Sequence, residues 1–432
     1  MRRFIMMGQK QSLRCFSSSA RSVMSFGDGS HGALGLPSSL IGLGGDAYEP
    51  TPVPGLPSDV CSVSAGHYHS LAVTAQGEVW AWGRNHEGQL GRGLLAPRDS
   101  WNVPTRVEGL NQVKVRAAFA SGVISTAIGD DGSLWVWGKS KHGQLGLGKG
   151  ISETVVPSRV EALAREKIVK VSLGWGHALA QTEDGKLFGW GYSADGRLGQ
   201  VGKALEVFPL NSVADRELSS SKLEVAENMV LKGIEKEKNM PIIWEPSLIE
   251  EENGVGIVDV ACGLDHSLVL CVNGNLLSGG SNIYGQLGRV AQDYGMVPVT
   301  TSFIPISISS GLGHSLAICQ VESSEAIGGA TSIISWGWNQ FFQLGRAGPG
   351  SCPLAVKGLA GETPVAVSGG RAHSIALTSK GEVWVWGCGK SGRLGLGSST
   401  DEVEPSLLEY LEGSEVLQVA SGFDHNLVLV AN

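Results

Sequence analysis

Short apolar runs alternate with polar, glycine-ended turns along most of the chain. In residues 374–387 the apolar run Ser374–Leu377 precedes the turn Thr378–Gly381, and a second apolar run, Glu382–Trp386, follows. A glycine-ended turn between β-branched and aromatic runs predicts a β-hairpin. In Val383–Trp386 both alternating sets of positions are apolar, which is typical of a strand buried on both faces. The pattern therefore predicts hairpins that lie between other sheets.

The same unit recurs along the sequence, and Val365–Gly397 nearly repeats Val60–Gly93. A proline-led strand such as Pro104–Val107 closes most units, and proline belongs on outer or edge strands. A Gly-x-Leu-Gly element marks seven units and ends at Gly35, Gly91, Gly146, Gly199, Gly288, Gly345 and Gly395. One sheet with two apolar faces cannot bury itself, whereas a ring of such sheets can. The predicted fold is all-β, a seven-bladed β-propeller of four-stranded antiparallel blades.

Each end of the chain carries half a unit. The first Gly-x-Leu-Gly element, in Ser25–Gly35, has no inner strands before it, and Val416–Val430 has no outer strands after it. We therefore expect the C-terminal strands to pair with a strand near Val23–Phe26 and to close the ring.

Residues 1–22 differ from the rest, and we interpret residues 23–432 as the propeller. The N-terminal segment has no acid before Asp28, and its basic residues are Arg2, Arg3, Lys10, Arg14 and Arg21. Four of these basic residues share one helical face, which is typical of a transit peptide. The string Arg14–Ser18 resembles the cleavage signature of plant mitochondrial presequences, with the cut after Phe16. The mitochondrial matrix is the expected location. The alternatives are a plastid location and a basic tail without a targeting role.

Composition limits the expected partners. The chain has 33 Lys and Arg against 41 Asp and Glu, a net charge of −8. Without the five basic residues of 1–21, the charge is 28 − 41 = −13. An acidic body binds phosphate poorly, so RNA contact is expected to be indirect. The seven cysteines form no CxxC motif, as expected in a reducing matrix, and no apolar run of about 18 residues predicts a membrane span.

An insertion at about 202–244 follows the third full repeat. Within it, Ser221–Glu224 fits a capping box, and Leu223, Ala226, Val230 and Ile234 follow helical spacing. This spacing predicts an amphipathic helix at about 222–238 that docks a partner. The alternative is a disordered, solvated loop.

Six units carry a histidine at the same position of a Gly-x-x-His turn. We interpret these histidines as structural, each bonding backbone in its own blade; the alternative places them around one mouth of the central channel. The two residues before each histidine vary, which indicates either a recognition surface or sequence drift without a function. A metal site is not expected, because the histidines belong to different blades. The candidate partner-binding mouth comprises Tyr68, His69, Trp175, His177, Asp265, His266, His314, Arg371, His373, Asp424 and His425.

Tryptophan and glycine motifs predict core rather than chemistry. The tryptophans in the WxWG register are expected in the core: Trp80, Trp82, Trp135, Trp137, Trp190, Trp336, Trp384 and Trp386. Those outside it, the candidates for an exposed role, are Trp101, Trp175, Trp244 and Trp338. Gly143–Lys149 matches the start of a P-loop, but Gly150 replaces the hydroxyl residue that would bind Mg²⁺. No catalytic set lies outside the repeat, so no enzyme, cofactor or metal is expected.

The frame VxxVSxGxxHSLAVTxxGxVWxWGxNxxGQLGxG resembles the repeat of the regulator of chromosome condensation family over about 23–432, apart from the insertion. The resemblance implies a seven-bladed propeller. Family members include an exchange factor for the GTPase Ran and a plant UV-B photoreceptor. In this chain, His314 and His425 match the position of the exchange factor's channel-mouth histidines. Photoreception is not expected. The photoreceptor carries repeated GWRHT motifs, whereas here only Gly174–Ala178 is similar to them, and this segment lacks the arginine. The Ran-binding wedge is not expected either, because the loop that carries it has constant length here.

The resemblance to plant mitochondrial, exchange-factor-like members implies a function. It implies a non-enzymatic scaffold that supports organelle RNA processing, including intron splicing, and so respiratory-complex biogenesis. Protein partners from the RNA-processing machinery are expected. The alternative is a guanine-nucleotide exchange factor for a mitochondrial small GTPase.

Overall fold

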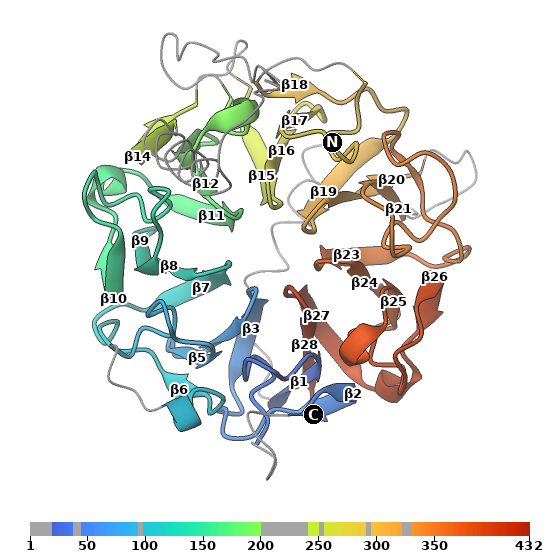
Figure 1. Ribbon diagram of the computed structural model, residues 1–432, viewed down its shortest axis with the longest axis horizontal. Helices are drawn as coiled ribbons and strands as arrows, with labels where there is room; N and C mark the ends of the chain where they lie inside the picture. The colour runs from blue at the N-terminus through green and yellow to red at the C-terminus, as the bar shows by residue number, and fades with distance from the viewer. Residues whose placement is uncertain are drawn as a thin grey trace, which may run out of the picture.

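A computed structural model describes residues 20–37, 45–93, 98–199, 241–249, 255–290, 295–321 and 331–432. These residues form seven four-stranded antiparallel sheets, arranged as blades around a central channel (Figure 1). The predicted seven-bladed propeller is therefore confirmed. Most of the predicted insertion, including the helix at 222–238, and residues 1–19 of the predicted transit peptide lie outside the described residues.

We number the blades along the chain, each from its inner strand outward. Blade 1 contains β3 (Val60–Ala65), β4 (His69–Thr74), β5 (Val79–Gly83) and β6 (Thr105–Arg106). Blade 2 contains β7 (Val115–Ala120), β8 (Ile124–Gly129), β9 (Leu134–Lys139) and β10 (Glu153–Arg159). Blade 3 contains β11 (Ile168–Leu173), β12 (His177–Thr182), β13 (Leu187–Tyr192) and β14 (Ile242–Leu248). Blade 4 contains β15 (Ile257–Cys262), β16 (His266–Cys271), β17 (Leu276–Gly280) and β18 (Val297–Pro298).

The remaining blades complete the ring. Blade 5 contains β19 (Ile304–Ser310), β20 (His314–Gln320), β21 (Thr331–Gly337) and β22 (Leu354–Ala355). Blade 6 contains β23 (Pro364–Gly369), β24 (His373–Thr378), β25 (Val383–Gly387) and β26 (Glu402–Leu407). Blade 7 contains β27 (Glu415–Ser421), β28 (His425–Ala431), β1 (Arg21–Gly27) and β2 (Ala47–Pro52). Short 3-10 helices lie at η2 (Arg98–Ser100), η3 (Glu161–Leu163), η4 (Ala194–Gly196), η5 (Lys390–Gly392) and η6 (Glu409–Leu411).

Blade 7 is built from both ends of the chain, as predicted. β1 pairs antiparallel with β28, with Val23 opposite Leu429. The sheet order is β2-β1-β28-β27, so each end contributes two strands. β1 starts at Arg21, whose side chain is buried, and this corrects the predicted boundary at residue 22. Arg21 and Ser22 belong to the strand that closes the ring.

The core lies between the blades. The second strand of a blade, such as β24, is buried at every residue because neighbouring sheets cover both of its faces. Seven apolar clusters are present among the described residues, one at each junction between neighbouring blades. This sealing explains why both alternating positions of the strand are apolar.

The WxWG tryptophans divide into two groups, which corrects the expectation that all eight are core. Trp82, Trp137, Trp190, Trp336 and Trp386 are buried, whereas Trp80, Trp135 and Trp384 are only half-buried. Each buried indole donates to a Gly-x-Leu-Gly carbonyl of the preceding blade; Trp137 Nε1, for example, lies 2.8 Å from the Gln89 oxygen. The buried tryptophan therefore bonds two blades together.

Candidate functional site at one mouth of the central channel

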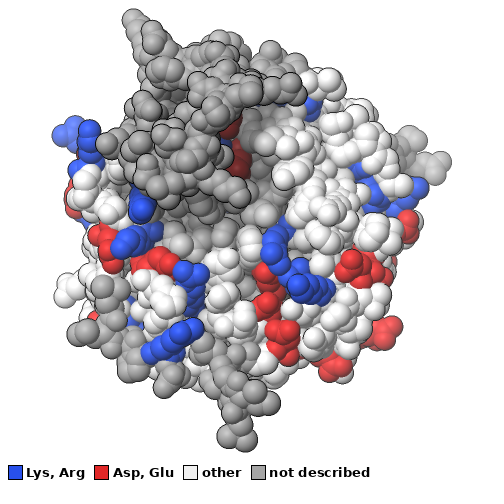
Figure 2. All heavy atoms as spheres, in the orientation of Figure 1, with Lys and Arg blue, Asp and Glu red and all other residues white. Residues whose placement is uncertain are grey.

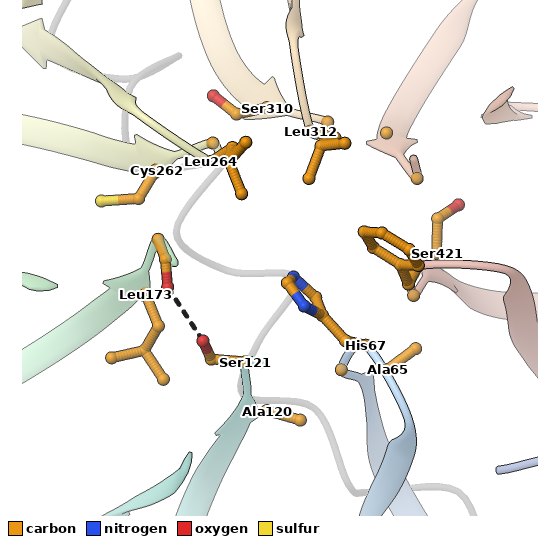
Figure 3. Close-up of a pocket in the computed structure, with 18 of the residues that line it drawn as sticks. Ala65, His67, Ala120, Ser121, Leu173, Cys262, Leu264, Ser310, Leu312 and Ser421 are labelled. Carbon is orange, nitrogen blue, oxygen red and sulfur yellow. Dashed lines mark hydrogen bonds between the residues drawn. The ribbon is translucent and has the colours of Figure 1, made fainter. Parts of the chain in front are cut away.

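The first variable residue of the Gly-x-x-His turn lines the central channel. The channel encloses a cavity of about 180 Å³ formed by the inner strands of all seven blades. Figure 3 shows His67, Leu264 and Leu312 pointing into it from three different blades. The other first variable residues in its lining are Trp175, Arg371 and Phe423. The repeat thus brings six side chains of five kinds to one opening.

The second variable residue of the turn contacts either the loop after a third strand or a Gly-x-Leu-Gly element. The Arg84 guanidinium lies over the Tyr68 ring, 5.2 Å from its centroid. Arg197 Nη1 lies 2.8 Å from Asp265 Oδ1. These contacts place a second set of side chains at the channel opening, from blades 1 and 4.

Asp424 is the most enclosed acid of this mouth. Arg393 Nε lies 2.8 Å from its Oδ1, and Arg371 Nη2 lies 2.8 Å from its Oδ2. Burial raises the pKa of Asp424, and the two arginines oppose that rise. Because Arg393 is almost fully buried, this pair is shielded from salt. The carboxylate therefore fixes two cations at the junction of blades 6 and 7.

Aromatic rings occupy much of the mouth between blades 7 and 1. The His67 and Phe423 rings are 4.7 Å apart, and Arg371 lies 4.7 Å from the Phe423 centroid. Burial lowers the pKa of His67 to about 4, so its imidazole is neutral at neutral pH. On blade 3, Trp175 is 48% exposed and lies 4.8 Å from the His142 ring. Such rigid, half-exposed rings are enriched where proteins bind proteins.

The six repeated histidines lie behind this mouth, not on it. Their side chains are at most 1% exposed. Each Nε2 bonds the residue after the histidine position of the next blade, and His69 Nε2, for example, is 2.7 Å from Ser125 Oγ. We call each such histidine and its partner a clasp. The six clasps are His69–Ser125, His177–Ser267, His266–Ser315, His314–Ser374, His373–Asn426 and His425–Ser70. The structure confirms that the histidines are structural, but it corrects their partners: the imidazoles bond side chains of the neighbouring blade and do not line the mouth.

The proton positions in a clasp follow from its neighbours. Ser125 Oγ donates to the Gln89 carbonyl at 2.8 Å, so its own proton is used. The imidazole of His69 must then donate from Nε2, which leaves Nδ1 unprotonated. Burial lowers the pKa of His69, His266, His314 and His373 to about 3 and that of His425 to about 4. The pKa of His177 also lies well below its ordinary value because of burial.

The Gly-x-x-His spacing has a steric cause. A Cβ on Gly263 would lie 2.1 Å from Cε1 of His266. The same crowding occurs at Gly174, Gly311 and Gly370. The glycine leaves room for the imidazole that follows it three residues later.

The junction of blades 2 and 3 lacks a clasp, and three residues there differ from those at the same positions of the other repeats. Ile124 replaces the histidine, Ala178 replaces the serine, and Ser121 replaces the glycine. Ser121 Oγ instead donates to the Gly174 carbonyl at 2.9 Å (Figure 3). Gln144 Nε2 donates to the same carbonyl at 2.6 Å. An apolar pair plus two side-chain donors thus joins these blades.

Five of the predicted site residues lie at the mouth: Tyr68, Trp175, Asp265, Arg371 and Asp424. The site prediction omitted Arg197 and Arg393, which bind the two acids. The available signal was the second residue of Gly-x-Leu-Gly, which is arginine in these two blades only. Within the described residues, no group of three or more His, Cys, Asp or Glu side chains is placed to hold a metal ion. No helix of the described chain is long and apolar enough to cross a membrane.

Comparison with known proteins gives consistent matches. The profile of the RCC1-like domain matches residues 22–428. The chain is 29% identical to the ultraviolet-B receptor of Arabidopsis thaliana, over 90% of this chain and 78% of the receptor. It is 32% identical to a secretion-regulating guanine nucleotide exchange factor of Bos taurus, over 72% of this chain but only 64% of that protein. The solved structure of Prp20p from Saccharomyces cerevisiae, described with its binding to Gsp1p and histones, superposes with a TM-score of 0.74. That match has 21% identity and covers 98% of this chain and 94% of Prp20p.

Proposed function

Because the chain belongs to the RCC1-like domain family, we propose that it is a non-enzymatic scaffold for organelle RNA processing. The proposed location is the mitochondrial matrix, supported by the basic, acid-free segment before Asp28. There it would support intron splicing and, through it, the biogenesis of respiratory complexes. Its partners would be proteins of the RNA-processing machinery.

The observation that carries the scaffold proposal is the mouth itself. One structural frame presents side chains of five kinds, from six of the seven blades, at a single opening: His67, Trp175, Leu264, Leu312, Arg371 and Phe423. Its arginines are paired: Arg84 with Glu87, Arg197 with Asp265, and Arg371 and Arg393 with Asp424. Figure 2 shows acidic and basic side chains interspersed on one face of the ring. Paired charges do not provide the free cations that a phosphate backbone requires, which favours a protein partner over RNA.

Transcript profiling tests this proposal. A loss-of-function line should retain unspliced organelle introns, and expression of the wild-type chain should restore splicing. Trp175→Ala should fail to restore it, because Trp175 is half-exposed at the mouth and carries little of the core. Val103→Ala, at a 51% exposed position on blade 1, serves as the matched control. Normal splicing in the loss-of-function line would contradict the proposal.

Exchange activity toward a mitochondrial small GTPase is the second candidate. It is favoured by the similarity to the Bos taurus exchange factor. Release of labelled nucleotide from purified matrix GTPases, with and without the full chain, tests it. Acceleration that Trp175→Ala abolishes would replace the scaffold proposal with an exchange factor acting through the same mouth.

A further inference from the structure

The seven blades provide an internal comparison for one loop. In every blade, four residues separate a glycine at or near the end of the third strand, such as Gly83 in blade 1, from the Gly-x-Leu-Gly element. Five of these loops carry charge, at Asp28, Arg84, Glu87, Lys139, Lys141, Asp195 and Lys390. The loops of blade 4, Ser281–Tyr284, and blade 5, Trp338–Phe341, carry none. These two neighbouring blades therefore break the pattern of the repeat.

These two loops and the residue that follows the second carry apolar side chains, which we call the blade 4–5 cluster: Ile283, Tyr284, Trp338, Phe341 and Phe342. Trp338 and Phe341 are half-buried, and the other three are exposed. Ile283 is 82% exposed, Tyr284 is 52% exposed and Phe342 is 39% exposed. The Tyr284 and Trp338 rings are 5.8 Å apart, and the Trp338 and Phe341 rings are 5.6 Å apart. The cluster thus spans the junction of two blades. Neighbouring apolar side chains with several exposed members mark an interaction site more often than single exposed residues do.

Phe342 also carries backbone strain. It stands where the other six repeats have the first glycine of Gly-x-Leu-Gly, and its φ is 65°. Those glycines have φ between 70° and 76°. A bulky residue with positive φ is unfavourable, whereas glycine adopts this conformation freely. The chain therefore tolerates a strained backbone at a position that carries an exposed aromatic ring, directly after Phe341 in the chain.

Charge is almost absent around the cluster. The described residues of blades 4 and 5 (255–290, 295–321 and 331–356) contain four charged residues: Asp259, Asp265, Arg289 and Arg346. The two acids form ion pairs with lysine and arginine of blade 3. The two arginines are buried and donate to the Ser278 and Ser335 carbonyls.

We propose that the blade 4–5 cluster is a docking site for an uncharged, apolar segment of a protein partner. A charged group brought against this surface would lose water without gaining a counter-ion, which excludes a basic or acidic peptide and the RNA backbone. Aromatic side chains are the usual anchors of protein interfaces, and charged residues are depleted from the centre of such interfaces. This inference rests on the scaffold part of the proposed function but not on its RNA-processing part.

Three substitutions isolate the cluster. Ile283→Lys introduces the residue that blades 2 and 6 already carry at the matching loop position, Lys141 and Lys390. Phe342→Gly restores the residue of the other six repeats. Glycine adopts the positive φ without strain, so the fold is preserved. Val272→Lys is the control: it is 51% exposed, in the turn after β16, at the end of that strand away from the mouth.

The probe is a display library of 12-residue peptides selected on the purified full chain. We expect the enriched peptides to be rich in aromatic and aliphatic residues and to lack charge. Fluorescence polarisation should show roughly tenfold weaker binding to the Ile283→Lys and Phe342→Gly variants and unchanged binding to Val272→Lys. Equal binding to all four proteins, or enrichment of charged peptides, would overturn the proposal. It would also fail if light scattering showed a wild-type dimer that Ile283→Lys dissociates, because the occupant would then be a second copy.

Complementation separates the two proposals. If the loss-of-function line has a splicing defect that Ile283→Lys and Phe342→Gly both repair fully, the docking site is refuted and the scaffold function stands. If the loss-of-function line splices normally, the RNA-processing function fails, and the peptide measurement alone decides the docking site.

Discussion

Removal of the serine from one clasp should cost more than removal of the whole clasp. In Ser125→Ala, the His69 Nε2–H loses the hydroxyl that accepts its hydrogen bond at 2.7 Å, while the imidazole remains buried. An unsatisfied buried donor costs about 1–3 kcal/mol, so we expect a loss of about 2 kcal/mol in unfolding free energy. The Gln89 carbonyl keeps its bond from Trp137 Nε1 at 2.8 Å and contributes little to the loss.

The double variant His69→Ile with Ser125→Ala should recover about 1 kcal/mol of that loss, because two apolar groups leave no polar atom unpaired. The junction of blades 2 and 3 already uses this pair, as Ile124 and Ala178. Urea unfolding followed by tryptophan fluorescence measures all three proteins, with Ala178→Ser as a control expected to change the free energy by less than about 1 kcal/mol. A double variant that is less stable than Ser125→Ala would refute the clasp as the source of the energy.

Three further outcomes follow from the same contacts. Acid should unfold the ring: the clasp histidines have pKa values near 3–4 when folded and about 6.5 when unfolded, so the unfolded state binds more protons between these values. Stability should therefore fall as pH drops below about 6.5, by up to about 1.4 kcal/mol per histidine per pH unit, and circular dichroism against pH checks this. Gly263→Ala should lower the unfolding temperature markedly, because the new Cβ meets His266 at 2.1 Å, whereas Gly45→Ala, with nothing within 4 Å, should not. A chain that starts at Arg21 should fold, whereas a chain that starts after Gly27 should not, because it lacks the strand that pairs with β28; solubility and circular dichroism distinguish the two.

The fold was predictable because its signals are local and repeated. A hairpin such as 374–387 shows itself in its glycine-ended turn and in the apolar positions on both faces of each strand. Repetition then fixes the number of blades, and the incomplete units at the two ends indicate how the ring closes. The pairing of Val23 with Leu429 confirms this reasoning.

The site was predicted only in part, for a physical reason. The variable turn indicated Tyr68, Asp265 and Asp424, because position within a repeat is a local property. It did not indicate that Asp424 binds Arg393, since that contact joins two blades. The repeat also did not distinguish a buried histidine from one at the rim, because both fit the same register.

The sequence by itself determined the number of blades, the hairpins, the closure by both ends and the positions that vary. The tertiary structure decided which blade each repeated side chain contacts. His69 bonds Ser125 of the next blade, and aromatic side chains of blades 4 and 5 meet on one surface. The period of a repeat records local geometry and burial. The partner across a junction depends on how one sheet is rotated against the next, and only packing of the complete ring fixes that rotation.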